Sequence, residues 1–358
     1  MNRQKHSQRQ QGKKTPGPDK AEGQGEDKAK VVKKPLGLEV EEKFPPFPQE
    51  LLEEDGAWQI SLSFINLSDE LIKEIKQQGL EIAWKHHRLV LHRKATQQLL
   101  WASTTWLDPQ ICPIHSIGEG NRMLKALGRD WGYIPLAAYR RAALIAEGIR
   151  PWKRLKWGEE LPYKRSGAWT LLDANTMLLS PRTSHPVPNG CCEFEEDKNE
   201  PPSRAYLKLW EVFTLCGFRP QAGEQTIDIG SCPGGWTWVL AKLGCKVIAV
   251  DKAPLDPKVA ALPGVVEMNE SAFGLRPDKI GPIDWFFADI ICYPEKLLEM
   301  VERWMELGEV RNWVCTVKLQ GPEAAAVLEK FRAIPGSRLI HLHANKHEVT
   351  WIKLADPK

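Results

Sequence analysis

Four ionisable residues in the C-terminal half stand where two kinds of charge could meet. Asp289 follows one apolar strand, Lys318 follows another, Glu348 opens the last strand, and Lys208 lies in a helix before the first strand. A neighbouring ammonium lowers the pKa of a lysine, and a carboxylate raises it. Because a free lysine titrates about three pH units above neutrality, Lys318 needs partial burial and a like-charged neighbour to accept a proton from a hydroxyl.

A glycine-rich turn in the same half predicts a nucleoside-cofactor pocket. It joins an apolar strand at 226–230 to a helix at 236–243, and a second strand then ends on Asp251. Glycines leave room for a ligand against the backbone, and helix N-terminal amides bind its carboxylate or phosphate. Asp251 is placed to accept hydrogen bonds from ribose hydroxyls. The spacing Gly-x-x-x-Gly-Gly matches neither the dinucleotide fingerprint nor the P-loop, which favours a methyl donor.

Short apolar strands alternate with helices through the rest of this half. Strands are expected at 265–268, 283–288 and 313–317, helices at 294–307 and 322–334, and two final strands at 338–343 and 348–353. The short turn between the last two requires them to be antiparallel. We therefore predict an α/β fold with a doubly wound, Rossmann-like sheet and an antiparallel C-terminal pair. Ligands of such sheets bind beyond the carboxyl ends of the strands, where the four charged residues would meet.

At these residues the chain resembles the FtsJ-type family of 2′-O-ribose RNA methyltransferases. That family carries a Lys-Asp-Lys-Glu tetrad on a sheet that binds S-adenosylmethionine. The matching motifs are the first-lysine helix at 202–208, the glycine turn at 228–236, Asp289, Val-Lys318 and Lys-His-Glu-Val at 346–349. The resemblance covers about residues 200 to 354. Within the family the chain is most similar to the RlmM-like branch, which methylates a cytidine of large-subunit (23S) ribosomal RNA and carries an N-terminal THUMP-type RNA-binding domain.

The resemblance implies a role for each matching residue. Lys318 would accept the proton of the ribose 2′-hydroxyl, Lys208 and Glu348 would position Lys318, and Asp289 would keep lysine and methyl group aligned. The family commonly has an acid near the adenine where this chain has Glu270 or Ser271, and either could serve. The implied contacts to S-adenosylmethionine are Ser203, Gly230, Cys232, Pro233, Gly234, Gly235, Trp236, Asp251, Ser271 and Asp289.

Two other functional hypotheses remain open from the sequence. Cys292 stands three residues after Asp289, a spacing reminiscent of RNA cytosine-C5 methyltransferases, in which a cysteine attacks the base. The proline that precedes that cysteine in those enzymes is missing, and C5 chemistry gives no role to Lys318 with Glu348. Alternatively, the protein is an RNA-binding ribosome-assembly factor that has kept the fold without the activity. Adenine-N6 chemistry is disfavoured, because no Asn/Asp-Pro-Pro-aromatic segment follows the strand at 283–288.

The composition of the N-terminal half bears on which substrate the protein binds. Residues 1–34 hold ten Lys/Arg against four Asp/Glu and almost no apolar residues, which is typical of a disordered basic tail that attracts phosphates. From residue 57 the pattern predicts a compact α+β unit. Its expected elements are a strand at 58–64, a helix at 68–76 capped by Ser68, a strand at 80–92, helices at 120–128 and 139–146, and a last strand ending at Leu172.

These patterns divide the chain into four parts. They are a basic tail at 1–45, an α+β, THUMP-like RNA-binding domain at 50–180, a flexible linker at 181–201 and the methyltransferase domain at 202–358. Within the second part, the segment 150–157 interleaves Lys and Arg with Trp, side chains that bind phosphates and stack on unpaired bases.

The net charge, the cysteines and the apolar segments of the chain limit its expected partners, cofactors and location. The formal net charge is only +3, so RNA binding must come from basic patches. The eight cysteines include no Cys-x-x-Cys pair, and we expect reduced thiols and no metal. No apolar run of membrane length and no signal-peptide pattern occur, which favours a soluble, cytoplasmic protein without a membrane partner. The sequence does not determine the oligomeric state, although a monomer is favoured.

Overall fold

A computed structural model describes residues 45–54, 56–321 and 323–355 of the 358-residue chain. The expected basic tail at 1–45 therefore lies almost entirely outside the described residues. The C-terminal half and the N-terminal half are built from separate sheets, of which the C-terminal one carries the candidate site.

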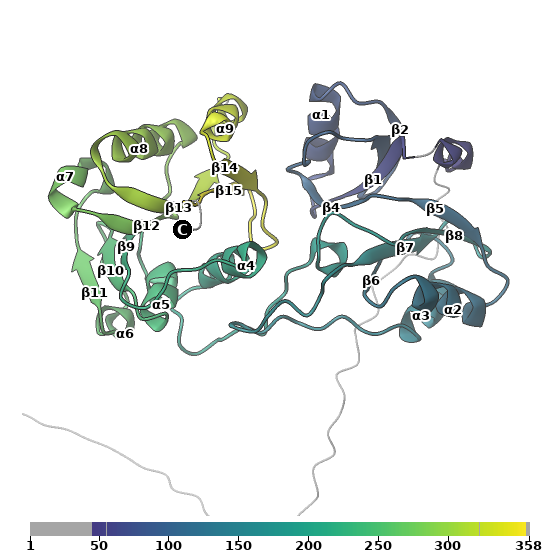
Figure 1. Ribbon diagram of the computed structural model, residues 1–358, viewed down its shortest axis with the longest axis horizontal. Helices are drawn as coiled ribbons and strands as arrows, with labels where there is room; N and C mark the ends of the chain where they lie inside the picture. The colour runs from purple at the N-terminus through teal and green to yellow at the C-terminus, as the bar shows by residue number, and fades with distance from the viewer. Residues whose placement is uncertain (1–44, 55, 322, 356–358) are drawn as a thin grey trace, which may run out of the picture. The chain divides into compact units, whose positions relative to one another are not determined.

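Seven strands form one mixed sheet in the C-terminal half (Figure 1). β9, β10, β11, β12 and β13 are parallel, whereas β15 runs antiparallel to β13 and β14. This arrangement confirms the doubly wound, Rossmann-like sheet with an antiparallel end. In order across the sheet the strands are β11 (Val265–Met268), β10 (Lys246–Val250), β9 (Gln225–Ile229), β12 (Ile283–Ala288), β13 (Val310–Lys318), β15 (Glu348–Lys353) and β14 (Ser337–Ile340).

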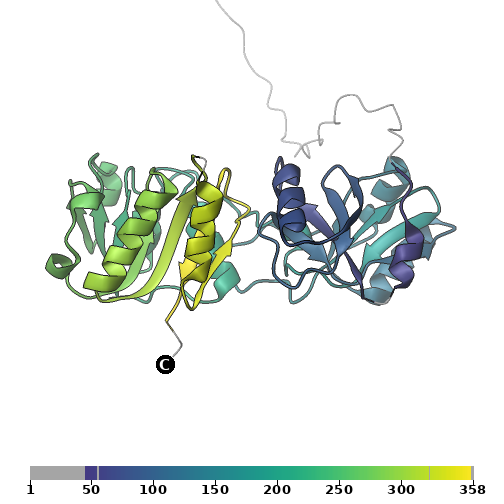
Figure 2. The ribbon, with the colours of Figure 1, turned by 90° about the horizontal axis from the view of Figure 1, so that it is seen from above.

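Helices cover both faces of this sheet. α4 (Tyr206–Cys216) and α5 (Gly235–Lys242) pack on one face, and α8 (Pro294–Leu307) and α9 (Ala324–Ala333) pack on the other. Seen from above, α8 and α9 lie side by side (Figure 2). Three short helices complete this half: α6 (Pro257–Ala260), η3 (Ala272–Gly274) and α7 (Pro277–Ile280).

The middle strands are largely apolar because both of their faces are covered. In β12, Trp285 and Phe287 belong to the core beneath α4 and α5, while Phe286 and Ala288 belong to the core beneath α8 and α9. Successive strand side chains point to opposite faces, so one apolar run supplies both cores. Asp289, Lys318 and Glu348 lie at or directly after strand ends, at the edge of this apolar core.

The N-terminal half contains two four-stranded sheets, with only β6 and β7 pairing in parallel. The first sheet has the order β2 (Ile82–His86), β3 (Leu89–Arg93), β1 (Trp58–Ser63), β4 (Ala102–Trp106). The second has the order β5 (Gln110–Pro113), β8 (Thr176–Ser180), β7 (Gly167–Leu171), β6 (Trp131–Tyr133). The helical segments are η1 (Gln49–Glu53), α1 (Ser68–Gln77), α2 (Ile117–Leu127), α3 (Tyr139–Glu147) and η2 (Pro188–Gly190).

Several expected elements of the sequence differ in the structure. Ser68 is the first residue of α1 and does not cap it, because its hydroxyl bonds Ser63 Oγ at 2.8 Å instead. The segment 80–92 is a hairpin of two strands that turns at His87, whose φ is +48°. The strand that ends before Leu172 is not the last one, since β8 follows. The strand expected at 338–343 ends at Ile340, which lengthens the connection to β15.

Candidate active site

The four charged residues meet at one edge of the C-terminal sheet and form a closed ring of ion pairs, called the tetrad below. Lys318 Nζ lies 2.6 Å from Asp289 Oδ1 and 2.5 Å from Glu348 Oε2. Lys208 Nζ lies 2.9 Å from Asp289 Oδ2 and 2.6 Å from Glu348 Oε1. Each carboxylate thus bridges both ammonium groups. The antiparallel course of β15 makes this possible, because its first residue pairs directly with the last residue of β13.

The tetrad is largely screened from water, which strengthens its electrostatics. The four side chains are between 11% and 14% exposed. Burial would lower the pKa of Lys318, but Asp289 and Glu348 outweigh burial and raise that pKa above its ordinary value. Burial would likewise raise the pKa of Asp289, but Lys208 and Lys318 outweigh it and lower that pKa. In the protein without bound ligands, the tetrad therefore favours the protonated form of Lys318.

The glycine turn between β9 and α5 approaches other parts of the protein closely. A Cβ atom on Gly230, whose φ is +78°, would lie 2.7 Å from Ile290 Cα. A Cβ atom on Gly234, whose φ is +113°, would lie 2.9 Å from Val259 Cγ1. The sequence predicted that these glycines make room for a ligand, and the fold itself also leaves no room for a side chain at either position.

Ser203 supplies an unpaired polar atom beside this turn. Its hydroxyl is buried and has no hydrogen-bond partner within the described residues. A Cβ atom on Gly235 would lie 2.5 Å from that hydroxyl, so the hydroxyl faces the first residue of α5. A buried hydroxyl without a partner is costly, and the free amides of a helix N-terminus lie next to it. Together they form a place for an anionic group such as a carboxylate.

Asp251 closes the turn from the side of β10. Asp251 Oδ2 accepts a hydrogen bond from the Cys232 amide at 3.2 Å, and Oδ1 accepts one from Ala253 at 3.1 Å. The Cys232 side chain is exposed, and the Cys232–Pro233 peptide bond is cis. A carboxylate can accept several hydrogen bonds, so Asp251 retains capacity for ribose hydroxyls.

Asp228, at the start of the glycine motif, is a charged group that the sequence reading did not single out. It is buried, and burial raises its pKa to about 7. Thr237 donates a hydrogen bond to Asp228 Oδ2 at 2.6 Å, while Oδ1 is buried without a partner. An apolar strand interrupted by one acid immediately before the glycines was the signal that could have identified it.

The remaining predicted cofactor residues differ in what they offer. The Trp236 side chain packs in the core, and its indole N–H donates to the Ala205 carbonyl, which leaves only its backbone for a ligand. Ser271 precedes η3, and its carbonyl accepts a hydrogen bond from Gly274. Glu270 is exposed at the end of β11. Which of Glu270 and Ser271 contacts an adenine stays a prediction.

Cys292 has the properties of a structural thiol. It is partly buried against the core beneath α8 and α9. Burial raises its pKa to about 11, although the Lys318 ammonium acts in the opposite direction. Only the thiolate is an effective nucleophile, and a thiol with this pKa stays protonated near neutrality. The cytosine-C5 alternative therefore lacks an activated cysteine.

A buried acid on α4, Glu211, holds this helix to the connection between β14 and β15. Its carboxylate accepts hydrogen bonds from the His343 and Ala344 amides at 2.6 Å and 3.0 Å. Burial raises its pKa to about 8. Glu211 lies one turn after Lys208, and the segment it binds leads to Glu348, so it joins the supports of two tetrad members. The sequence analysis did not identify it, although an acid within a largely apolar helix was a usable signal.

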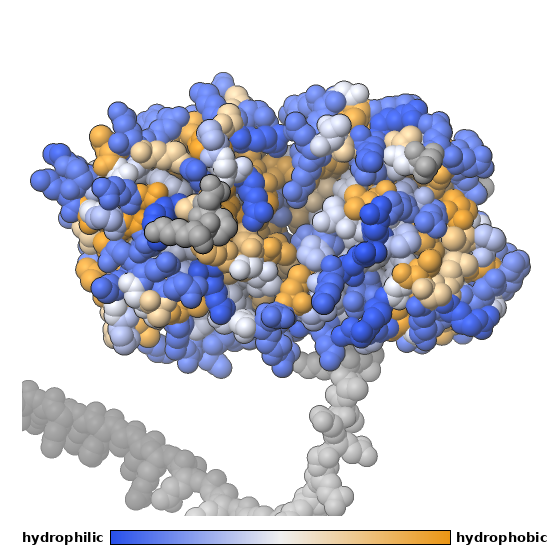
Figure 3. All heavy atoms as spheres, in the orientation of Figure 1, coloured by the Kyte–Doolittle hydropathy of each residue, from blue (hydrophilic) through white to orange (hydrophobic). Residues whose placement is uncertain are grey.

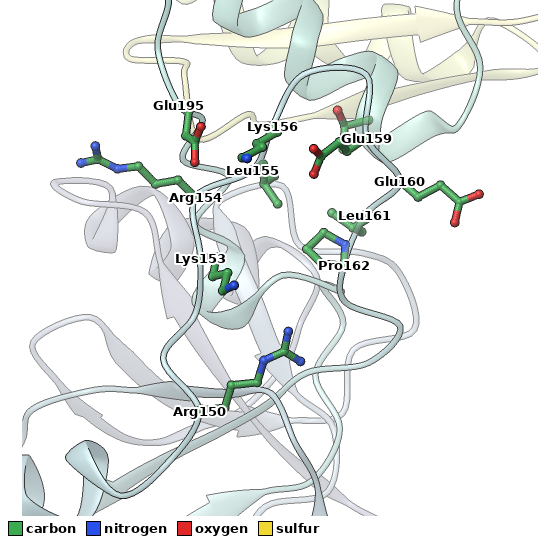
Figure 4. Close-up of a pocket in the computed structure, with 11 residues that line it drawn as sticks. Arg150, Lys153, Arg154, Leu155, Lys156, Glu159, Glu160, Leu161, Pro162 and Glu195 are labelled. Carbon is green, nitrogen blue, oxygen red and sulfur yellow. The ribbon is translucent and has the colours of Figure 1, made fainter.

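A pocket with several cationic residues opens beside the tetrad. Lys208 and Glu348 form part of its wall, together with Arg154, Arg204 and Lys346. Arg154 also lines a second pocket, formed by the segment 150–162 and shown in Figure 4, where Arg150 and Lys153 point inward and Arg154 points away. Glu159, Glu160 and Glu195 line that second pocket too, so its cations are partly balanced.

Tryptophans in the basic segment serve different purposes. Trp157 stacks on Trp210 with ring centroids 5.2 Å apart, and the Arg219 guanidinium lies 5.6 Å from the Trp157 ring. Trp157 is thus a packing residue and not a free platform for a base. Trp152 is 39% exposed and remains available to a partner. The expected linker also contributes to packing, since Val187, Cys192 and Phe194 are buried.

Two further observations concern metals and membranes. No group of three or more His, Cys, Asp or Glu side chains arranged to hold a metal ion occurs in the described ranges. None of the helices within the described residues is both long enough and apolar enough to cross a membrane.

Comparison with known proteins places this site in context. Residues 201–342 match the family described as FtsJ-like methyltransferase. A ribosomal RNA large subunit methyltransferase M from Aromatoleum aromaticum is 32% identical over 167 residues, which cover 42% of this chain and 45% of that protein. The protein of the same name from Halorhodospira halophila is 34% identical over 135 residues, which cover 37% of this chain and 39% of that protein. An rRNA methylase structure from Streptococcus thermophilus is 16% identical, covers 38% of this chain and 89% of that chain, and has a TM-score of 0.30.

The chain spans less than half the length of the curated relatives it matches. The family match includes the glycine turn, Lys208, Asp289 and Lys318, and it ends shortly before Glu348. Most residues of the candidate site therefore lie within the matched range. Residues 201–342 of this chain are thus similar to the FtsJ-like methyltransferase family.

Proposed function

We propose that this protein transfers a methyl group from S-adenosylmethionine to a ribose 2′-oxygen of RNA, with a cytidine of large-subunit ribosomal RNA as the substrate. The observation that carries the proposal is the tetrad, in which two lysines and two acids bridge one another at the ligand-binding edge of the sheet. The substrate class comes from the curated relatives, which are named ribosomal RNA large subunit methyltransferases. Such an activity would operate in the cytoplasm, where ribosomes assemble.

The residues around the glycine turn fit the cofactor. Bound S-adenosylmethionine would supply a methyl group on a positively charged sulfur, which is a good leaving group. The Ser203 hydroxyl and the α5 N-terminus provide donors for its carboxylate, and Asp251 provides acceptors for its ribose. We also assign Gly230, the segment 232–236, Ser271 and Asp289 to this pocket.

Lys318 would accept the proton of the attacking hydroxyl. The carboxylates of Asp289 and Glu348 hold Lys318 in its protonated form in the protein without bound ligands. Bound RNA would bury Lys318 further, and burial lowers the pKa of a lysine. The like charge of Lys208 nearby acts in the same direction. Lys208 and Glu348 also fix the position of Lys318, because each forms part of the ring of ion pairs. Holding the hydroxyl in line and excluding water would provide most of the rate.

The N-terminal half would bind the RNA. Its two four-stranded sheets and their helices are compatible with a THUMP-like domain at 50–180, followed by a linker at 181–201 and the methyltransferase domain at 202–358. The pocket beside the tetrad continues this surface, since Arg154, Arg204 and Lys346 line it together with Lys208. Cations near the reactive centre can position the phosphates that flank the target nucleotide.

The test is transfer of labelled methyl from S-adenosylmethionine to unmodified large-subunit rRNA, followed by nuclease mapping of the product. The wild type should label a ribose oxygen. Lys318→Ala should reduce transfer at least about a hundredfold, because general-base catalysis typically contributes that much. Its affinity for S-adenosylmethionine, measured by calorimetry, should stay nearly unchanged.

Cys292→Ala is the matched control and should retain wild-type turnover. Label on a base that disappears in Cys292→Ala would replace the proposal with cytosine-C5 chemistry. RNA binding by the wild type without any methyl transfer would favour the non-catalytic assembly factor.

A further inference from the structure

The loop that follows Asp289 exposes apolar side chains beside the tetrad. Ile291 is 82% exposed and Tyr293 is 60% exposed. Figure 3 shows one face of the protein, on which hydrophilic side chains dominate and hydrophobic atoms occur in scattered groups. A single exposed apolar residue needs no explanation, but two of them within four residues of a tetrad carboxylate suggest a contact with a ligand.

The Tyr293 ring, on the loop that leaves Asp289, lies against the loop that leaves Lys318. It follows Asp289 by four residues, and a Cβ atom on Gly321 would lie 3.5 Å from its Cδ1 atom. Gly321 itself follows Lys318 by three residues. The Tyr293 backbone is held by α8, because its carbonyl accepts hydrogen bonds from the Lys296 and Leu297 amides at 3.0 Å and 3.3 Å. Tyr293 therefore has an anchored backbone and an exposed ring that lies against the loop following Lys318.

We infer that Tyr293 is the platform on which the base of the target nucleotide stacks. The inference rests on the proposed function, since it names a subsite for the same RNA. The ribose carbon that carries the 2′-oxygen is bonded to the carbon that carries the base. A ribose whose 2′-oxygen reaches Lys318 must therefore place its base at the rim of the tetrad. An exposed aromatic ring at that rim offers a stacking surface to any base, because every base has a π-face.

The properties of the side chain suit this role. A tyrosine presents a flat apolar surface and keeps its hydroxyl in water, and fixing it costs little conformational entropy. Ile291, two residues earlier on the same loop, adds an apolar contact at the edge of the platform. RNA enzymes and binding modules commonly recognise unstacked bases on aromatic side chains.

The test compares Tyr293→Ala and Tyr293→Phe with the wild type, using labelled S-adenosylmethionine and an unmodified large-subunit rRNA transcript. Tyr293→Ala should lower kcat/KM for RNA by roughly 5- to 150-fold, which is the range that corresponds to the loss of one base–aromatic stack. Tyr293→Phe keeps the ring and should stay within about twofold of the wild type. Affinity for S-adenosylmethionine should be equal in all three proteins.

Phe218→Ala is the matched control, because Phe218 is an exposed aromatic residue that contacts Trp285 instead of the tetrad loops. It should leave kcat/KM unchanged. A second measurement uses a transcript that lacks the base at the mapped target nucleotide. The wild type should lose activity on this transcript, whereas Tyr293→Ala should lose nothing further.

The outcomes separate the two claims. Ribose methylation by the wild type with unchanged kcat/KM in Tyr293→Ala would overturn the stacking platform and leave the proposed function intact. Equal losses on the abasic transcript in wild type and Tyr293→Ala would overturn it too. Absence of ribose methylation by the wild type would overturn the proposed function, and the platform with it.

Discussion

The charge on Lys318 decides whether the tetrad can accept a proton. Lys318 contacts two carboxylates and shares them with Lys208, so the ring holds two positive and two negative charges. The carboxylates raise the pKa of Lys318 in the protein without bound ligands. The neutral amine that the proposed mechanism requires is therefore a minor form near neutral pH, and its fraction grows as pH rises towards that pKa.

This charge state predicts the pH dependence of the reaction. Between about pH 7 and about pH 9, kcat/KM for RNA should rise about tenfold per pH unit without a plateau, because kcat/KM reports the ionisation of the free enzyme. Initial rates at subsaturating RNA measure it. Cys292→Ala should have the same profile, since that thiol, with a pKa of about 11, stays protonated over the range. A plateau below about pH 8 would mean that the essential base has a lower pKa than Lys318.

At the scale of elements, α4 and the connection between β14 and β15 form one support. Glu211 accepts two backbone hydrogen bonds from that connection, and Lys208 and Glu348 extend from the two joined elements into the tetrad. A shift between α4 and this connection would change the distance between Lys208 and Glu348. Glu211 is therefore a positioning residue that acts without touching the substrate.

Glu211→Ala should separate these elements. Two buried amides would lose their acceptor, which should lower the free energy of unfolding by about 1–3 kcal/mol, measured by urea denaturation. The kcat value should fall at least about tenfold, while affinity for S-adenosylmethionine should change little. Glu211→Gln keeps one acceptor oxygen and should restore much of kcat. Glu302→Ala, at an exposed position of α8, is the control; equal kcat losses in Glu211→Gln and Glu211→Ala would contradict the positioning role.

The sequence predicted the C-terminal elements better than the N-terminal ones for a physical reason. The strands at 265–268 and 283–288 have the predicted limits, because predominantly apolar segments there end at polar residues or turns. In the N-terminal half, the segment 80–92 turns at His87 without glycine or proline, so the pattern did not indicate a hairpin. A local sequence pattern therefore indicates a turn only where that turn contains a residue such as glycine or proline.

The candidate site shows the same limit. The convergence of Asp289, Lys318 and Glu348 followed from strand order, because all three lie at one edge of the sheet. The direction of the Lys318 pKa shift did not follow, since it depends on how many carboxylates contact the ammonium group. The support by Glu211 was also missed, because its partners are backbone amides more than 130 positions away in the chain.

At the scale of the whole molecule, basic residues are concentrated in a few segments, while the net charge of the chain stays low. The formal net charge is only +3, yet residues 1–34 hold ten basic residues against four acidic ones. The tail at 1–45 lies almost wholly outside the described residues, so its contribution rests on charge alone. Within the described part, Lys153 and Lys156 belong to a second basic segment, whose pocket also contains acids.

Deletion of residues 1–45 should therefore weaken RNA binding more at low salt than at high salt. The region 1–34 carries a net charge of six, ten minus four, and each neutralised phosphate releases counterions. If all six act, the slope of log K against log salt concentration should flatten by up to about 4 for single-stranded RNA. Filter binding over a salt series measures the slope. The double variant Lys153→Ala and Lys156→Ala, in the full chain, should flatten it by no more than about 1.4, which separates the two segments. An unchanged slope after the deletion would mean that the tail does not contact RNA phosphates, and RNA affinity would then depend on the folded surface alone.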